Sequence, residues 1–216
     1  MHAATDYGRT GSSSEENKKA NIDFGMDIVN AAILLEAKHF INIDTAFPEN
    51  INEYAESKKK FLQPAKQSIN KHVGLKLTNA CRYQMYGGGL SNTGFINQAI
   101  RQCEEDKRLI EMTEGLQKRD FIHIDDVVIA IRKIVDAYSE LENFESIAVG
   151  TGVATTIREF MRIVIKCLRS TTKINYGVLP YRANDPMILV ADISRLKKLK
   201  FQPAIALESG IRRFYK

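Results

Sequence analysis

The stretch HFINIDTAFPENINEYAESK, from His39 to Lys58, decides the expected fold because a strand pattern is followed at once by a helix pattern. Residues 39–45 alternate in hydrophobicity, which predicts a β-strand. A short loop carries Pro48. From Glu53 the apolar side chains recur at helical spacing as far as about His72. The stretch therefore predicts one strand–loop–helix unit.

The rest of the chain repeats this order. The residues from Gly8 to Lys19 are polar and predict a loop, and Pro64 is expected to kink or split the helix that contains it. Further strands are expected over residues 73–77, 121–124 and 147–149. Further helices are expected around residues 28–35, 95–104, 127–138 (capped by Asp125 or Asp126), 157–168 (opened by a Thr156–Glu159 capping box) and 194–199 (capped by Asp192). This alternation predicts an α/β fold with a largely parallel sheet.

Tyr54 and Lys58 carry the most informative chemical pattern. Four residues apart on a helix, they share one face. An ammonium group beside a phenol favours the phenolate and lowers the phenol pKa, which would suit Tyr54 to proton transfer. Thr45, at the end of the preceding strand, could orient a substrate oxygen beside that phenol. Taken alone, this spacing is more typical of an exposed tyrosine beside a solvated lysine face.

Composition excludes several classes of protein. The 216 residues are 44% hydrophobic and 26% charged, as expected of a globular chain with a core of its own. The cysteines, Cys81, Cys103 and Cys167, are too few and too widely spaced for a disulfide framework or a Cys-x-x-Cys site. The four histidines lack metal-site spacing, so no metal is expected.

The net charge of +5 suits an anionic ligand. The lysine clusters at residues 58–60 and 197–200 lack interleaved aromatic residues, so we expect no nucleic-acid partner. No apolar stretch has the length of a membrane span, and residues 1–17 have no signal-peptide core. These features predict a cytoplasmic protein with no membrane partner.

Several separated segments together resemble the NAD(P)-dependent epimerase/dehydratase family, the extended short-chain dehydrogenase/reductases that modify nucleotide sugars. Within this family the chain also resembles the CDP-abequose synthase-like sugar reductases. In the family's order, the segments are His2-Ala3-Ala4 with Asn21; Thr45 with Tyr54-Ala55-Glu56-Ser57-Lys58; Asn79, Tyr86-Gly87 and Arg119-Asp120-Phe121-Ile122-His123-Ile124-Asp125-Asp126; and Tyr181-Arg182, Asp185, Ala191-Asp192-Ile193-Ser194, Gln202-Pro203 and Gly210-Ile211.

The resemblance implies a partial Rossmann-like parallel sheet with a smaller C-terminal substrate lobe. Residues 1–118 would form the remaining part of the dinucleotide-binding domain, and residues 119–216 mainly the substrate-binding part, interleaved with the first. It implies NAD or NADP as cofactor and a nucleotide sugar as substrate. The implied catalytic residues are Thr45, which hydrogen-bonds the sugar oxygen, Tyr54, the acid/base, and Lys58, which lowers the Tyr54 pKa and binds the nicotinamide ribose.

The resemblance also implies binding roles for five further residues. Ala3, Ala4 and Asn21 would line the cofactor, and Asn79 and Arg182 would hold the substrate diphosphate. Asn79 could instead be a turn-capping amide, and Arg182 a surface arginine. The Arg119–Asp126 string could be structural, with Asp120 and Asp126 bracing a strand–helix junction and a cap, and His123 packed.

Two departures from the family bear on activity. No glycine-rich dinucleotide turn precedes His2, and Gly87-Gly88-Gly89 is in the wrong place to replace it, so cofactor affinity is expected to be poor. Ala46-Phe47 follows Thr45 where the sugar dehydratases carry an acidic pair, which favours ketone reduction or epimerisation over water elimination. The leading hypothesis is a sugar 4-ketoreductase or epimerase; the alternative is a truncated non-catalytic remnant or partner-binding subunit of the same fold. A homodimer is one assembly that could complete the cofactor site, and the sequence does not fix the oligomeric state.

Overall fold

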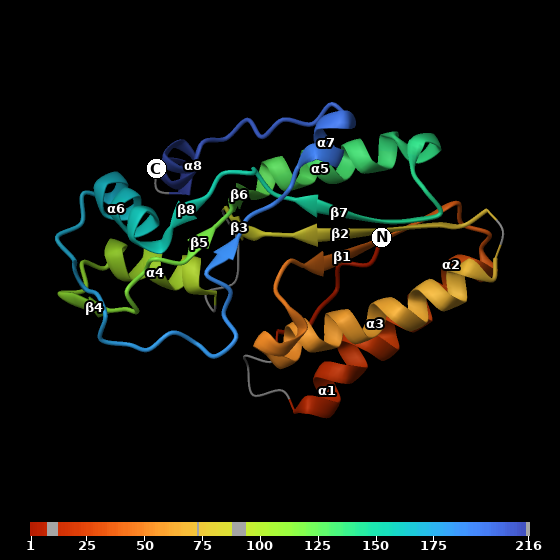
Figure 1. The fold of residues 1–216 in the computed structure, drawn as a ribbon, viewed down its shortest axis with the longest axis horizontal. Coiled ribbons are helices and arrows are strands. Elements are labelled where there is room, and N and C mark those ends of the chain that lie inside the picture. Colours follow the sequence, from red (N-terminus) through yellow and green to blue (C-terminus); the bar gives the residue numbers. More distant parts are fainter. Residues whose placement is uncertain (8–12, 73, 88–93, 215–216) are drawn as a thin grey trace.

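The computed structural model describes residues 1–7, 13–72, 74–87 and 94–214 as an α/β structure around a parallel sheet (Figure 1). The strands of this sheet are β1 (His39–Thr45), β2 (Lys76–Arg82) and β7 (Phe144–Val149), in the order β1-β2-β7. Outside β1, His2 forms a parallel bridge with Asn42. The fold therefore confirms the α/β class with parallel strands.

Helices cover both faces of this sheet (Figure 1). On one face lie α2 (Phe24–Leu34) and α3 (Glu53–Asn70), and Phe40 and Leu77 of the sheet pack against Val29, Phe61 and Ile69 of these helices. On the other face lie α5 (Ile124–Asp136) and α7 (Ser194–Lys198), whose apolar side chains pack against Ile41, Ala80 and Ile147. Burial of both faces explains why the strands are rich in apolar residues on both sides.

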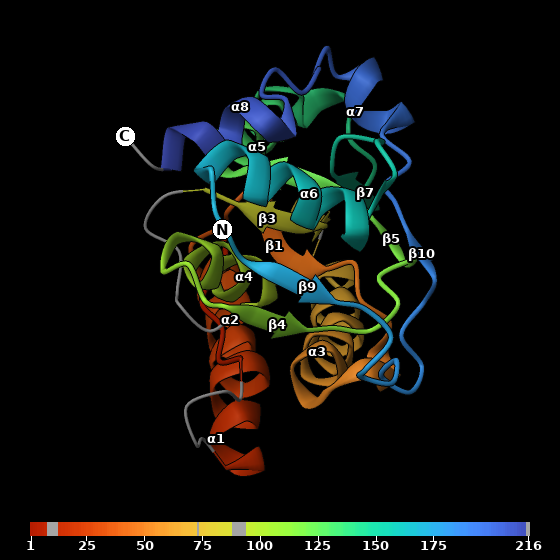
Figure 2. The same ribbon diagram turned by 90° about the vertical axis from the view of Figure 1, so that its left-hand side faces the viewer.

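A second body of structure lies beyond the carboxyl ends of β1, β2 and β7 (Figures 1 and 2). Its apolar core includes Ile100, Phe121, Phe160 and Ile211. Its elements are the helices α4 (Phe95–Glu104), α6 (Ile157–Leu168) and α8 (Leu207–Phe214) and the strands β3 (Gln84–Tyr86), β4 (Leu109–Glu111), β5 (Lys118–Arg119), β6 (Phe121–His123), β8 (Thr155–Thr156), β9 (Lys173–Asn175) and β10 (Ile188–Leu189). Ligands of parallel α/β folds bind at the carboxyl ends of the strands, so the space between the two bodies is the place to search for a site.

Several local predictions are confirmed. The strand at residues 39–45, the helix at residues 95–104 and the Thr156–Glu159 capping box occur as expected. The helix from Glu53 ends at Asn70 and continues through Pro64 rather than splitting there. The proline removes one backbone donor, but the helix stays intact because Phe61 and Ile69, on either side of it, are buried against the sheet.

Other local predictions are wrong. Part of the expected loop before Lys19 is a helix, α1 (Ser14–Lys18), which begins with a Ser13–Glu16 capping box. Of the strand expected over residues 73–77, residue 73 lies outside the described residues, and β2 begins at Lys76, after Leu75. Leu35, expected on an apolar helix face, is exposed. Residues 88 and 89 of the Gly87-Gly88-Gly89 loop lie outside the described residues.

Candidate active site

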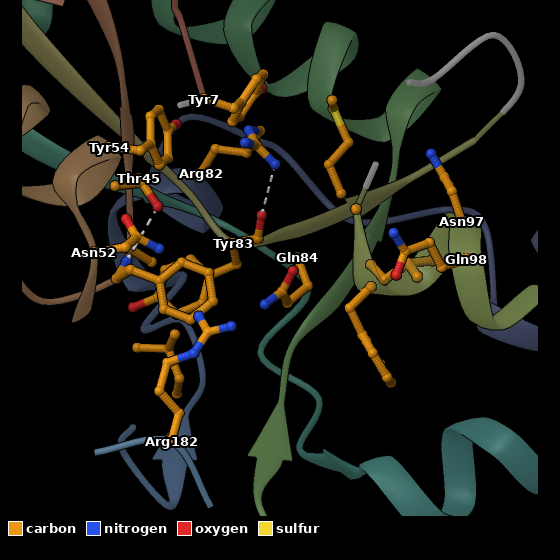
Figure 3. Close-up of a pocket in the computed structure, with 17 residues that line it drawn as sticks. Tyr7, Thr45, Asn52, Tyr54, Arg82, Tyr83, Gln84, Asn97, Gln98 and Arg182 are labelled. Carbon is orange, nitrogen blue, oxygen red and sulfur yellow. Dashed lines mark hydrogen bonds between the residues drawn. The ribbon is translucent and has the colours of Figure 1, made fainter. Parts of the chain in front are cut away.

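Thr45 and Tyr54 meet at the carboxyl end of the sheet. Thr45 is the last residue of β1, and Tyr54 lies in the first turn of α3. Asn52 fixes the start of that helix because its side chain accepts a hydrogen bond from the Ala55 N–H at 2.8 Å. Both Thr45 and Tyr54 line one cleft of about 450 Å³ (Figure 3). The structure therefore brings these two predicted residues together.

Lys58 lies one helical turn beyond Tyr54 and is 1% exposed. Its Nζ atom has no hydrogen-bond partner among the described residues. Burial lowers the pKa of Lys58 to about 8; the nearby carboxylate of Asp44 opposes this shift, and the charges of Arg82 and Lys59 add to it. A buried ammonium without a partner destabilises the fold, so the position of Lys58 calls for a role other than stability.

The adjacent Lys59 is in the opposite situation. Its Nζ donates to the Oδ2 of Asp44 at 2.8 Å and to the backbone oxygen of Thr45 at 2.7 Å. Asp44 is fully buried and also accepts from Asn79 Nδ2 at 2.9 Å and from the Thr45 N–H at 2.7 Å. Lys59 thus ties α3 to the end of β1 and holds Thr45 in place.

The pKa of Tyr54 corrects one expectation. Burial raises this pKa above its ordinary value, and the cation that opposes the rise is Arg82, by its charge and by side-chain hydrogen bonding; Lys58 is not among the causes. The pKa of the Tyr54 phenol is therefore not lowered by Lys58 in this structure. The Tyr54 phenol therefore keeps its proton at neutral pH, which suits it to donating a proton more than to accepting one.

Arg82 is a site residue that the sequence analysis missed. It ends β2 at the position paired with Thr45, and its side chain lines the same cleft, close to Tyr54 and Tyr7 (Figure 3). Neighbouring parallel strands place paired residues on the same face of the sheet, so the Thr45–Arg82 pairing explains this position. In the sequence, Arg82 follows the region of the next strand after Thr45. Only the register of the two strands shows that Arg82 pairs with Thr45 and therefore reaches the cleft.

Asn21 organises the segment that follows His2. Its Oδ1 accepts from Thr5 Oγ1 at 3.0 Å and from the Asp6 N–H at 2.7 Å, and its Nδ2 donates to the Asp6 backbone oxygen at 2.8 Å and to Ser57 Oγ at 2.9 Å. Asn21 therefore fastens this segment to α3, one residue from Lys58. Ala3 and Ala4 are exposed just before the fastened part.

Asn79 and Arg182 lie in different surroundings. Asn79 is buried within the sheet, where its Oδ1 accepts from Asn42 and its Nδ2 donates to Asp44, and it lines neither cleft. Arg182 lines the Tyr54 cleft and also a second cleft of about 850 Å³. Phe47, Gln84, Phe95 and Gln98 also line both clefts, which makes the two clefts continuous.

The Arg119–Asp126 string is largely structural. Asp120 accepts hydrogen bonds from the backbone N–H groups of Thr151, Gly152 and Ala191. Asp126 accepts from the N–H groups of Ala204 and Ile205. The two carboxylates therefore brace the junction as the structural alternative predicted. Neither caps α5, because the His123 ring accepts from the Asp125 N–H at that position.

The residues present fit a nucleotide cofactor in one specific respect. Both His2 Nε2 and Lys58 Nζ are buried without partners, and burial lowers the pKa of His2 to about 4, with the charge of Lys58 adding to the shift. Because the charge of Lys58 acts on His2, the unsatisfied Lys58 donor lies close to the residue that directly precedes Ala3 and Ala4. A ribose hydroxyl would supply the acceptor that Lys58 lacks.

Two other kinds of site receive no support. Within the described residues, no cluster of three or more His, Cys, Asp or Glu side chains could hold a metal ion. In the same part of the chain, every helix is too short or too polar to cross a bilayer.

Curated and solved proteins resemble this chain over most of its length. CDP-abequose synthase of Salmonella muenchen is 29% identical over 219 residues, which covers 99% of this chain and 74% of that protein. UDP-glucuronate 4-epimerase of Thermodesulfobacterium geofontis is 28% identical, over 65% of this chain and 42% of that protein.

Solved structures share the fold. UDP-glucuronic acid 4-epimerase of Bacillus cereus, in complex with UDP-glucuronic acid and NAD, has a TM-score of 0.85 at 20% identity, over 100% of this chain and 73% of that one. UDP-glucose 4-epimerase of Thermotoga maritima with UDP-glucose has a TM-score of 0.84 at 20% identity, over 99% and 74%. The model of the NAD dependent epimerase/dehydratase family matches residues 1–150 of this chain. The chain therefore belongs to the NAD dependent epimerase/dehydratase family.

Proposed function

We propose that this chain is an NAD(P)-dependent enzyme that reduces or epimerises a nucleotide sugar, most simply as a sugar 4-ketoreductase. The observation that carries the proposal is the meeting of Thr45 and Tyr54 in one cleft, with the unpartnered Lys58 Nζ one helical turn away. In this proposal Tyr54 and Lys58 also contact the cofactor, beside Ala3, Ala4 and Asn21.

Each proposed residue has a step that its geometry suits. A bound nicotinamide would supply or accept the hydride at the sugar carbon. The Thr45 hydroxyl would donate to the sugar oxygen and polarise its carbonyl bond. Tyr54, protonated because burial raises its pKa, would donate its proton to the oxygen as the alkoxide forms. Lys58 would hold the cofactor ribose and thereby fix the distance over which the hydride moves.

The lining of the Tyr54 cleft favours reduction or epimerisation over elimination of water. Ala46 and Phe47 follow Thr45 in that lining, and no carboxylate lines this cleft among the described residues. Elimination needs a base to take a proton from carbon, and a carboxylate is the usual one in such a site. The cleft instead offers hydroxyl, phenol, amide and guanidinium groups.

The continuous clefts suit a substrate with two parts. The sugar would occupy the Tyr54 cleft, and the nucleoside would occupy the larger cleft between Leu109 and Tyr181. Arg182 lies where the two clefts meet, and its planar guanidinium can hold two phosphate oxygens at once. We assign the diphosphate to Arg182 and not to Asn79, whose amide is bonded inside the sheet.

Calorimetric titration with NADH and NADPH, followed by CDP- and dTDP-sugars, tests the proposal. A dissociation constant in the micromolar range for either cofactor would support the proposal, and Tyr54→Phe is expected to reduce turnover about 10²- to 10⁴-fold without changing the fold. Tyr176→Phe is the matched control, since Tyr176 lies under Arg158 outside both clefts. A folded, monodisperse protein that binds neither cofactor would exclude an enzyme acting alone.

The second candidate is a partner-binding subunit. The observation that favours it is the outer edge of β1, where, among the described residues, His2 makes only a single bridge. Light scattering after size exclusion would show a homodimer, which is the assembly we propose. Cofactor binding that appears only with another chain present would favour the second candidate.

A further inference from the structure

Arg82 places a permanent positive charge at the reacting end of the Tyr54 cleft. It is the partner of Thr45 in the register of β1 and β2, and the Ala46 N–H donates to its backbone oxygen at 3.0 Å. Figure 3 shows its side chain near the Tyr54 and Tyr7 rings, away from the end of the cleft where Arg182 lies. The two guanidinium groups therefore serve different parts of one site.

The Arg82 side chain is not engaged in a structural ion pair. Its Nη1 donates to the backbone oxygen of Tyr83 at 3.2 Å, and no carboxylate of the described residues lies within ion-pairing distance. By contrast, the buried Arg119 is paired with Asp185 at 2.6 Å. A guanidinium that faces a cleft without a carboxylate is available to an anion that forms there.

The anion that must form in the proposed reaction is the Tyr54 phenolate. When Tyr54 gives its proton to the product oxygen, the phenol O–H bond breaks, the product O–H bond forms, and a negative charge stays on the phenol oxygen. A proton from solvent later restores the phenol. Arg82 is better placed than Lys58 to balance this charge, because Arg82 lines the cleft and acts on the Tyr54 phenol, whereas Lys58 does neither, and an arginine stays charged.

We propose that Arg82 positions the Tyr54 phenol and balances the charge of its phenolate, leaving Lys58 to the cofactor ribose. This inference deepens the proposed function and rests on it for the catalytic consequence. The electrostatic pairing itself is a property of the free protein, so it can be tested without substrate or cofactor.

The test is a titration of Tyr54 in protein labelled with 3-fluorotyrosine, followed by ¹⁹F NMR. The fluorinated phenol ionises at lower pH, which keeps the titration in a range where the protein stays folded. The Tyr54 signal is the one that is lost in Tyr54→Phe. The variants are Arg82→Met, Arg82→Lys and Lys58→Met, with Lys60→Met as a charge-matched control on the solvent side of the same helix.

We expect Arg82→Met to raise the Tyr54 pKa by about 1–2 units, because an opposite charge close to an ionising group shifts its pKa by that much. Arg82→Lys should restore most of the shift, and Lys60→Met should leave the titration unchanged. If Arg82→Met does not fold, Arg82→Gln takes its place, since it keeps a hydrogen-bond donor without the charge.

Two results would overturn the inference. In one, Arg82→Met leaves the Tyr54 titration unchanged while Lys58→Met raises it, which returns the role to Lys58. In the other, Arg82→Met and Arg82→Lys shift it equally, which excludes charge as the cause. Calorimetry with NADH and NADPH on the unsubstituted protein separates the two proposals: absence of binding to both would contradict the proposed function, while the titration still decides the Arg82–Tyr54 pairing.

Discussion

Two polar regions of this molecule differ in whether their buried hydrogen-bonding groups have partners. The junction cluster, Arg119, Asp120 and Asp126, has its hydrogen-bonding groups occupied by backbone groups and one ion pair. The cleft cluster consists of Thr45, Tyr54 and Arg82, which line the cleft, and Lys58, which lies one helical turn from Tyr54 and lines neither cleft. Among the described residues, its buried lysine has no hydrogen-bond partner and its arginine has no carboxylate partner. The sequence analysis identified residues of both regions: the Arg119–Asp126 string in the first, and Thr45, Tyr54 and Lys58 in the second.

This difference distinguishes residues that stabilise the fold from residues of the candidate site. Buried polar groups in folded proteins are almost always hydrogen-bonded, and an exception needs a physical reason. In the junction cluster the polar groups tie distant segments together, which is their reason. In the cleft cluster the unpartnered Lys58 Nζ is retained at a cost to stability, and the proposed function would supply the reason through cofactor binding.

Asp120→Asn is expected to have the largest effect on folding. Each Asp120 oxygen accepts from backbone N–H groups, so the amide nitrogen would face donors instead. We expect a loss of about 3–4 kcal/mol in the free energy of unfolding, measured by urea denaturation. Asp125→Asn is the control, since Asp125 is exposed, and it should change stability by less than about 0.5 kcal/mol. Similar losses in both variants would refute the scaffold role of Asp120.

Lys58→Met is expected to act in the opposite direction. Burial lowers the pKa of Lys58 from 10.5 to about 8, so the folded chain releases this proton more readily than the unfolded chain. The destabilisation is complete below about pH 8 and disappears as the pH rises toward about 10.5. We therefore expect the variant to be more stable than the unsubstituted protein by about 2–3 kcal/mol at neutral pH.

The pH dependence provides the control for this variant. The unsubstituted protein should gain stability between about pH 8 and pH 10.5 relative to Lys58→Met, so urea denaturation at about pH 7 and pH 10 should show a shrinking difference. Calorimetry should show loss of NADH binding in the same variant. A variant less stable at neutral pH would mean that Lys58 has a partner in solution.

The sequence predicted what depends on local pattern. The strand ending at Thr45, the helix that presents Tyr54 and Lys58, and the Thr156–Glu159 cap follow from periodicity and capping chemistry. The same logic could have found α1, because Ser13 and Glu16 have capping-box spacing. That stretch was predicted as a loop because its polar composition outweighed the cap.

What the sequence did not predict depends on tertiary structure. The pKa of Tyr54 rises because of burial, which no spacing reveals. Arg82 enters the site through its register with Thr45, and register is a relation between two strands. Asn79 suited a diphosphate by its place in the chain, but in the fold its amide faces Asn42 and Asp44.

Asn21→Ala is expected to change stability least. It tests whether Asn21 only stabilises the fold or also supports the proposed cofactor site. The Asn21 amide is satisfied like a junction residue, yet it fastens the segment of Ala3 and Ala4 beside Lys58. The lost contacts are confined to the hydrogen bonds of one amide with Thr5, Asp6 and Ser57, so we expect a loss of about 1–2 kcal/mol in urea denaturation. Asn17→Ala removes another amide that donates to the Asp6 backbone oxygen and is the matched control. If the segment lines the cofactor, Asn21→Ala weakens NADH binding beyond its effect on folding, whereas Asn17→Ala does not. Equal affinities in the two variants would assign Asn21 to the scaffold alone.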